Sequence, residues 1–87
     1  MPSAAVVLSN PAGLHARPAA TFAMAANRFT AQVQIEKGGR RVDAKSVLKL
    51  IALNCGSGET VTIHTSGADQ DAALFALVEL VRSGLGE

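Results

Sequence analysis

The chain has 87 residues, 48% of them hydrophobic, which is enough to fill the single modest core of a domain of this size. Its net charge of +1 and its 3% aromatic residues argue against nucleic-acid binding, which relies on basic surfaces and base stacking. Cys55 has no second cysteine to pair with, and the chain has neither a signal peptide pattern nor the ~20-residue apolar run that spans a membrane. We therefore expect a cytoplasmic protein without membrane insertion.

The first half of the chain predicts a strand, a helix and a hairpin. Residues 4–9 are β-branched at their centre, which is typical of a strand. After the turn signal Asn-Pro-Ala-Gly, residues 16–28 are rich in alanine and carry a proline in the first turn, which predicts a helix. Residues 31–36 alternate apolar and polar side chains, and Gly38-Gly39 predicts a tight turn into a short returning strand.

The second half predicts a helix, a strand and a longer helix. Ser46 is suited to cap a helix over residues 47–53. Residues 60–65 alternate as a half-buried strand does. Asp69 is a candidate N-cap for a helix over residues 70–83, in which apolar side chains recur at helical spacing, and the glycine that follows ends this helix.

The order strand, helix, strand, strand, helix, strand, helix indicates an α+β fold. We expect a single domain over residues 1–87, with a four-stranded antiparallel sheet and all helices packed on one face of it. The ferredoxin-like split βαβ arrangement shares the first six elements. The order of the strands within the sheet stays open, because the order along the chain does not determine it.

A candidate site lies where a glycine turn meets the first predicted helix. Leu14 can anchor the turn in the core, which would direct His15 outward. The backbone N–H groups of Ala16 and Arg17 are available to an anion at the helix start, and the Arg17 guanidinium suits phosphate oxygens. A neutral imidazole is a competent nucleophile near physiological pH, so the pattern favours a phosphoryl acceptor. The alternative is that His15 only begins a helix and Arg17 is a solvated charge.

Two stretches carry a resemblance to a known family. GLHARPAA, residues 13–20, resembles the active-site signature of the HPr family, the histidine-containing phosphocarriers of the bacterial phosphoenolpyruvate-dependent sugar phosphotransferase system. DAKSVLKLIAL, residues 43–53, resembles the regulatory-serine helix of that family. With the element order and the length, the resemblance covers essentially the whole chain. It implies the HPr-like fold, an open-faced β-sandwich.

The resemblance also implies a function. His15 would accept a phosphoryl group on Nδ1 from phosphorylated enzyme I and pass it to enzyme IIA domains, while Arg17 steadies the phosphoryl charge. Such a protein is a carrier and not an enzyme with its own turnover, and it needs no metal and no cofactor. Ala12 departs from the family pattern, because this position often holds a small polar residue that could assist the turn.

The predicted helix after Ser46 has apolar residues on nearly all its faces. Ser46 matches the serine that an HPr kinase/phosphorylase modifies in some bacterial lineages, although a helix N-cap is the simpler role. We expect Leu50 and Leu53 to be buried. The resemblance implies that the remaining apolar residues, with a basic rim, dock enzyme I and enzyme IIA domains: Val47, Leu48 and Ile51, with Lys45, Lys49 and Arg17. The alternative is a helix sandwiched in the core.

Other functions stay open beside the sugar phosphocarrier. A specialised paralogue in a nitrogen-linked or regulatory phosphotransfer branch would use His15 with different partners. A small acylphosphatase-like enzyme would need a catalytic asparagine and a loop arginine, a pair that Asn10 and Arg17 mimic only faintly. We expect a monomer, in which His64 is a surface histidine and Cys55 is an inert, partly buried thiol.

Overall fold

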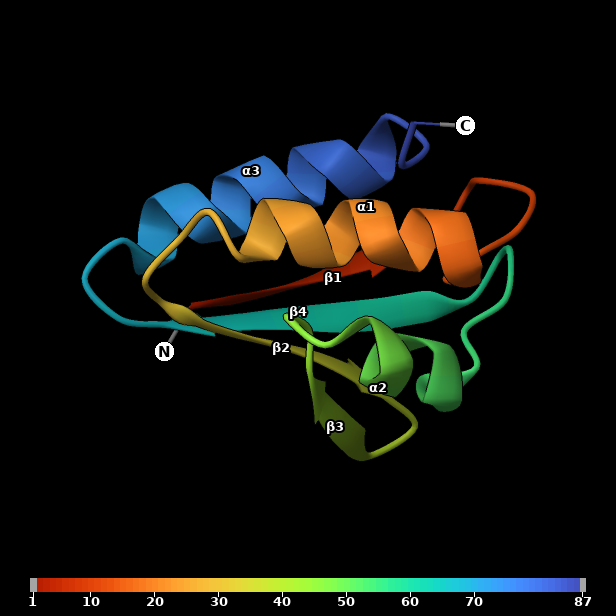
Figure 1. The fold of residues 1–87 in the computed structure, drawn as a ribbon, viewed down its shortest axis with the longest axis horizontal. Coiled ribbons are helices and arrows are strands. Elements are labelled where there is room, and N and C mark those ends of the chain that lie inside the picture. The colour runs from red at the N-terminus through yellow and green to blue at the C-terminus, as the bar shows by residue number, and fades with distance from the viewer. Residues whose placement is uncertain (1, 87) are drawn as a thin grey trace.

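The computed structural model describes residues 2–86 and has the predicted order of elements (Figure 1). Within these residues the chain forms four strands and three helices. Their bounds, in chain order, are β1 Ser3–Val7, α1 Ala16–Ala26, β2 Gln32–Lys37, β3 Arg40–Asp43, α2 Val47–Leu53, β4 Thr60–Ser66 and α3 Gln70–Arg82. The bounds of α2 are those predicted, and the other elements differ from the prediction by one or two residues at an end.

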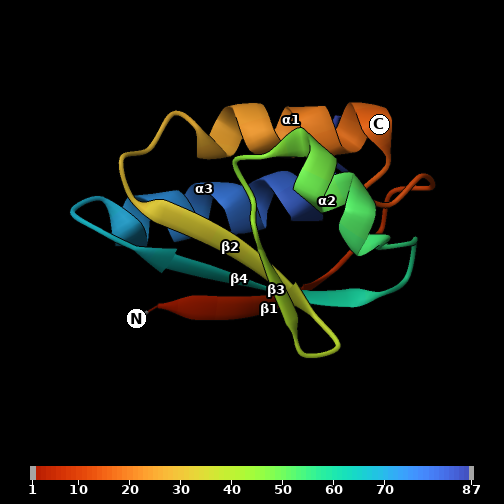
Figure 2. The same ribbon diagram turned by 60° about the horizontal axis from the view of Figure 1, so that its bottom comes forward.

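The strands form one antiparallel sheet in the order β1-β4-β2-β3. His64 in the central strand β4 lies opposite Ser3 of β1 and opposite Gln34 of β2. Gly38 and Gly39 both have positive φ angles and make the predicted tight turn between β2 and β3. The helices of the described chain cover one face of the sheet and leave the other open (Figure 2). The predicted open-faced α+β sandwich is therefore confirmed.

The pairing of β1 with β4 decides what surrounds the candidate site. Val7, at the end of β1, lies opposite Thr60, at the start of β4. Beyond this pair the Leu8 N–H donates to the Glu59 carbonyl at 2.9 Å, and the Gly58 N–H donates to the Leu8 carbonyl at 2.7 Å. The loop that leads to His15 therefore runs beside the loop that connects α2 to β4.

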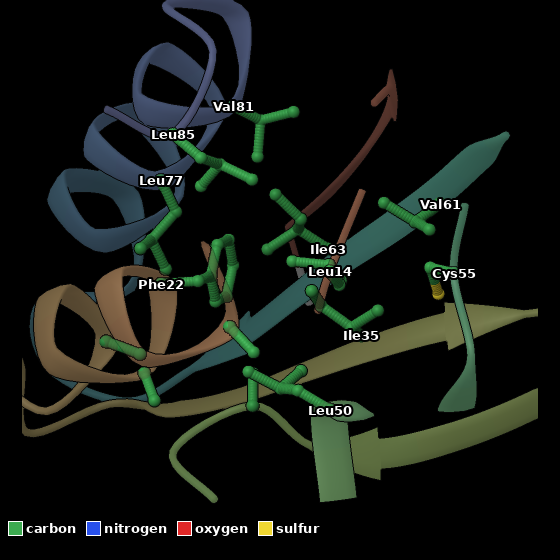
Figure 3. Close-up of a cluster of buried hydrophobic side chains, with 14 of the residues drawn as sticks. Leu14, Phe22, Ile35, Leu50, Cys55, Val61, Ile63, Leu77, Val81 and Leu85 are labelled. Carbon is green, nitrogen blue, oxygen red and sulfur yellow. The ribbon is translucent and has the colours of Figure 1, made fainter. Parts of the chain in front are cut away.

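The core lies between the helices and the sheet and is aliphatic and rich in alanine (Figure 3). Phe22 of α1 is its largest fully buried side chain. Leu14 is part of the same cluster and is 1% exposed, so the turn before α1 is anchored as predicted. The apolar residues of the two alternating strands and the two α2 residues expected to be buried are all buried, namely Val33, Ile35, Val61, Ile63, Leu50 and Leu53.

The helix α1 ends two residues earlier than predicted because an asparagine closes it. The Asn27 side-chain amide donates to the Ala23 carbonyl at 2.8 Å and to the Lys45 carbonyl at 3.1 Å. Such side-chain bonds compete with continuation of a helix. The amide therefore closes the last turn and also ties it to the segment before α2.

Asp69 is the N-cap residue of α3, as predicted, and its carbonyl accepts the Ala73 N–H at 2.9 Å, but its side chain makes no capping hydrogen bond to this helix. Its carboxylate accepts the N–H groups of Thr30 at 2.9 Å and Ala31 at 2.8 Å instead. The bond from Thr30, followed by that from Ala31, lowers the pKa of Asp69 against the opposing effect of burial. Asp69 thus joins the start of α3 to the loop before β2.

The caps of α2 and the end of α3 agree with the sequence. The Ser46 hydroxyl oxygen accepts the Lys49 N–H at 3.3 Å, as expected of an N-cap. After α3, Gly84 has a φ of +90° and its N–H donates to the Val81 carbonyl, while the Leu85 N–H donates to the Leu80 carbonyl. This pair of bonds is a Schellman motif, in which glycine is the favoured residue.

Candidate functional site

His15 is the residue immediately before α1, and its side chain is exposed. Its backbone is extended, with φ −85° and ψ −170°, and its carbonyl accepts the Ala19 N–H at 2.7 Å. Within the described residues its ring makes no capping hydrogen bond to the helix. The backbone of His15 therefore starts the helix while the imidazole is left for solvent or a reactant.

The first turn of α1 supplies the setting of an anion site. Ala16 and Arg17 are exposed, and their N–H groups belong to the end of an 11-residue helix where N–H groups lack partners within the helix. The first turn holds no acidic residue that would neutralise the positive end of the helix dipole. Pro18 is buried and has no N–H to offer. His15, Ala16 and Arg17 thus present an imidazole, two peptide donors and a guanidinium at one helix end.

The turn before His15 is built from contacts that the sequence did not reveal. Asn10 is 2% exposed, and its side-chain amide donates to the Gly13 carbonyl at 2.8 Å. The Gly13 N–H donates back to the Asn10 carbonyl at 3.2 Å. In the sequence, Asn-Pro predicts a turn at this point. It does not indicate that the Asn10 side chain is turned inward.

Gly13 is required by its surroundings as well as by its conformation. Its φ of +60° lies in the left-handed region, and a Cβ atom there would collide with the Cys55 carbonyl and come within 2.8 Å of Gly56. The next residue, Leu14, donates its N–H to the same Cys55 carbonyl at 2.9 Å. The residues before His15 are thus packed directly against the loop between α2 and β4.

With this geometry established, comparison with known proteins identifies the family. The family model described as "PTS HPr component phosphorylation site" matches residues 2–83. The chain belongs to the HPr family. Proteins of this family are phosphocarriers and not catalysts.

Curated relatives include members of three kinds. The chain is 49% identical over 69 residues to the HPr-like protein Crh of Halalkalibacterium halodurans, covering 79% of this chain and 82% of that protein. It is 42% identical over 78 residues to phosphocarrier protein HPr of Cupriavidus necator, covering 90% and 88%. It is also 42% identical over 82 residues to phosphocarrier protein NPr of Shewanella violacea, covering 94% and 90%.

Solved structures agree with the fold. An HPr structure from Thermoanaerobacter tengcongensis superposes with a TM-score of 0.96 at 38% identity, covering 100% of this chain and 98% of that one. A structure of an HPr dimer from the same organism superposes with a TM-score of 0.79 at 38% identity, with both chains fully covered. The HPr fold is therefore shared over the whole described chain.

The helix α2 is not enclosed in the core of this HPr-family protein. Leu50 and Leu53 are buried, and Val47 and Ile51 are half-buried against the core. Leu48 is 79% exposed. One side of α2 therefore packs inward while the other presents an apolar surface to solvent, so the alternative of a sandwiched helix is wrong.

The two lysines of the expected basic rim differ in their surroundings. Lys49 is exposed. Lys45 is half-buried, and its ammonium donates to the Phe29 carbonyl at 2.8 Å in the loop after α1. The Lys45 charge is thus tied to this loop, whereas Lys49 is the more accessible of the two.

An exposed apolar residue on α1 was missed by the sequence reasoning. Met24 is 70% exposed and lines a shallow hollow with Thr21, Arg28 and Leu80. Arg17, Thr21, Met24 and Arg28 recur at the spacing of one helix face. The signal was available in the helical spacing, because Met24 lies off the stripe of α1 that includes the buried residues Pro18, Phe22 and Ala26.

Two other residues noted from the sequence are His64, on the open face of the sheet, and Cys55, in the core. His64 is on the open face as expected, but its Nε2 lies 2.7 Å from a Glu36 carboxylate oxygen. Cys55 is buried, which raises the pKa of its thiol and agrees with the expected inert role. Among residues 2–86, no group of three or more His, Cys, Asp or Glu side chains is arranged to hold a metal, and no helix is both long and apolar enough to cross a membrane.

Proposed function

We propose that this protein is a cytoplasmic carrier of the phosphoenolpyruvate-dependent sugar phosphotransferase system, in which His15 accepts a phosphoryl group from phosphorylated enzyme I and passes it to enzyme IIA domains. The single observation that carries the proposal is the exposed imidazole at the start of α1, beside the N–H groups of Ala16 and Arg17. Membership of the HPr family supports the same role.

The chemistry of transfer needs little from the carrier itself. The lone pair of a His15 ring nitrogen, Nδ1 by resemblance to the family, attacks phosphorus as the bond from phosphorus to the donor breaks. Phosphoryl transfer of this kind is accelerated mainly by in-line positioning and by stabilisation of charge on the phosphoryl oxygens. The Ala16 and Arg17 N–H groups and the Arg17 guanidinium supply donors for those oxygens.

The exposed side of α2 is the proposed docking surface for enzyme I and the IIA domains. Leu48 offers the largest exposed apolar side chain of this helix, flanked by the half-buried Val47 and Ile51. Exposed apolar side chains that form a contiguous patch mark surfaces that bind a partner. Lys49, with Lys45 and Arg17, would attract acidic partners and set the orientation of docking.

Ser46 caps α2, and we propose phosphorylation by an HPr kinase/phosphorylase only as an additional regulatory mark. A phosphate at a helix N-terminus is favourably placed, since it meets the positive end of the dipole. Treatment of the protein with such a kinase and ATP, with Ser46→Ala as the control, tests the mark. Phosphorylation of the Ser46→Ala protein to the same extent would assign the mark to another residue.

The expected state in solution is a monomer. The HPr from Thermoanaerobacter tengcongensis has been solved as a dimer, so the mass of this protein in solution is the quantity to measure. Sedimentation equilibrium at several protein concentrations would return the mass of one chain, and a mass that doubles with concentration would instead indicate a dimer.

The nitrogen-linked or regulatory branch is the second candidate, and similarity to an NPr protein keeps it in view. The acylphosphatase-like alternative loses its support from Asn10. The amide of that residue is buried and donates to the Gly13 carbonyl, so it is engaged inside the turn.

The deciding experiment incubates the protein with phosphoenolpyruvate, magnesium and a sugar-type enzyme I, followed by intact mass measurement. We expect the gain of one phosphoryl group that is lost in acid, kept in alkali and absent from His15→Ala. No gain with an enzyme I that phosphorylates another HPr, together with a gain from a nitrogen-linked enzyme I, would move the protein to the second branch.

A further inference from the structure

The loop between α2 and β4, residues 54–59, forms one wall of the His15 turn. Its Cys55 carbonyl accepts the Leu14 N–H, and the Cys55–Gly56 peptide lies against Gly13. At its other end the Glu59 carbonyl accepts the Leu8 N–H. Any displacement of this loop therefore reaches the residues directly before His15.

An ion pair holds both ends of that loop. The Lys37 ammonium, at the end of β2, donates to the Asn54 carbonyl at 2.6 Å and lies 2.7 Å from one carboxylate oxygen of Glu59. The other carboxylate oxygen of Glu59 accepts the Gly56 N–H at 2.9 Å. One cation thus bridges the first and last residues of the loop, while the carboxylate fixes its middle.

The ionised state of this pair is supported by its surroundings. The hydrogen bond from Lys37, followed by the one from Gly56, lowers the pKa of Glu59 against the opposing effect of burial. Charge-assisted bonds are stronger and more directional than neutral ones. The other lysine or arginine ion pairs among residues 2–86, Arg41–Glu36 and Arg82–Glu79, lie at 3.4 Å and 3.6 Å and do not involve the loop.

We propose that Lys37 and Glu59 are positioning residues for His15, a role that rests on the proposed phosphocarrier function. The ion pair fixes residues 54–59, the Cys55 carbonyl then fixes the Leu14 N–H, and Leu14 leads directly into His15 at the start of α1. The pair thereby sets the direction of the imidazole relative to the N–H groups that meet the phosphoryl oxygens. Transfer is sensitive to such alignment because the attacking and leaving atoms must be in line.

The test uses two variants that remove the charge pair with little change of shape. Lys37→Met keeps the aliphatic stem, and Glu59→Gln keeps an acceptor for the Gly56 N–H. Lys37→Arg is the conservative variant, which keeps the positive charge and should behave like the wild type. Arg82→Met serves as the matched control, because it removes a different ion pair, that with Glu79 on the exposed surface of α3.

Two readouts follow the turn itself and do not require a partner protein. We expect the imidazole NMR signals of His15 to shift in Lys37→Met and Glu59→Gln and not in Arg82→Met. We also expect hydrogen exchange of the Leu14 N–H to accelerate more than that of the Ala44 N–H, which donates to the Val33 carbonyl at 2.9 Å between β2 and β3. Unfolding temperatures should match the control, since partly exposed ion pairs contribute little to global stability.

The third readout is the rate of phosphoryl transfer from enzyme I to His15. We expect a loss of roughly two- to fivefold in Lys37→Met and Glu59→Gln, the change equivalent to the coupling of a partly exposed ion pair, with recovery in Lys37→Arg. Unchanged His15 signals and Leu14 exchange would overturn the positioning role even if the rate fell. If the wild type accepted no phosphoryl group, the proposed function would fail, while the NMR and exchange data would still decide whether the pair orients the turn.

Discussion

The two histidines of the chain lie in regions with different chemistry. His15 stands at the exposed start of α1, beside peptide N–H groups and Arg17, in a segment without an acidic neighbour. His64 lies on the open face of the sheet, where its side chain is 14% exposed and contacts Glu36, which also lies 3.4 Å from Arg41. An imidazole beside unused N–H donors can receive a phosphoryl group, whereas one held by a carboxylate in a sheet has a partner that repels an incoming phosphate. The surroundings of the ring, and not the ring itself, separate the role proposed for His15 from that of His64.

The largest expected effect separates the histidines directly. His15→Ala should abolish phosphoryl acceptance, because no other described side chain combines an exposed imidazole with the helix start. His64→Gln should retain full acceptance, because glutamine can still hydrogen-bond with Glu36. Intact mass after incubation with enzyme I and phosphoenolpyruvate measures both. Phosphorylation of the His15→Ala protein to the wild-type level would show that His15 is not the phosphoryl acceptor.

The next effect concerns the turn that carries His15. Gly38→Ala forces alanine into a left-handed conformation in open space, so we expect a loss of about 1–2 kcal/mol and unchanged transfer. Gly13→Ala adds a collision with the Cys55 carbonyl to the same backbone strain, so its loss of stability should be larger and its transfer slower. Urea unfolding and the transfer rate test the pair. Equal stability losses would mean that the loop yields easily to the added methyl group.

A smaller effect is expected at Arg17. Arg17→Ala removes the charged donor and leaves the N–H groups of the helix start, so transfer should slow by about tenfold, less than for a fully buried donor of this kind. Arg28→Ala removes an exposed arginine that follows the other end of α1, which makes it the control for overall charge. Stopped-flow or quenched transfer from enzyme I gives both rates. Equal slowing by the two changes would assign Arg17 to general electrostatic attraction.

The smallest expected effect belongs to the open face and appears only in acid. The hydrogen bond with His64, aided by the charge of Arg41, lowers the pKa of Glu36 from 4.5 against the opposing effect of burial. Because the folded pKa lies below the unfolded one, the stabilisation is present above about pH 4.5 and is lost as the pH falls through the folded value. Glu36→Gln should therefore lose less stability than the wild type between about pH 6 and about pH 3.

Urea midpoints across that range measure the acid effect, with Glu79→Gln as a control carboxylate on the exposed surface of α3. Parallel curves for Glu36→Gln and the wild type would show that the Glu36–His64 contact does not contribute to acid sensitivity. The same variants should accept a phosphoryl group at the wild-type rate near neutral pH. The reason is that the helices, and with them the start of α1, lie on the opposite face of the sheet from Glu36 and His64 (Figure 2).

The sequence was most informative where structure depends on near neighbours. The start of α1 followed from a glycine turn and a proline within the same few residues, and the bounds of α2 followed from Ser46 and the apolar run behind it. Burial of Leu14, Leu50 and Leu53 followed from hydrophobicity and helical spacing. These signals are local, so a single sequence contains them in full.

Contacts between distant residues could not be read in this way. Glu36 and His64 are 28 residues apart, and the Asp69 carboxylate binds Thr30, 39 residues away. Asp69 occupies the predicted N-cap position of α3, but its carboxylate binds two remote N–H groups and not those of its own helix. The sequence alone does not show whether the N–H groups of its own helix or those of the distant loop lie closer to this carboxylate.

By itself the sequence determined the seven elements, the buried side of β2, β4 and α2, and the placement of His15 and Arg17 at a helix start, because periodicity and turn chemistry act over a few residues. Only the tertiary structure decided that β1 pairs with β4, and with it that the loop of Cys55 and Glu59 supports the His15 turn. The physical reason is that an antiparallel strand can pair with any strand of suitable register. The choice among them is made by packing of the whole core and not by any one segment.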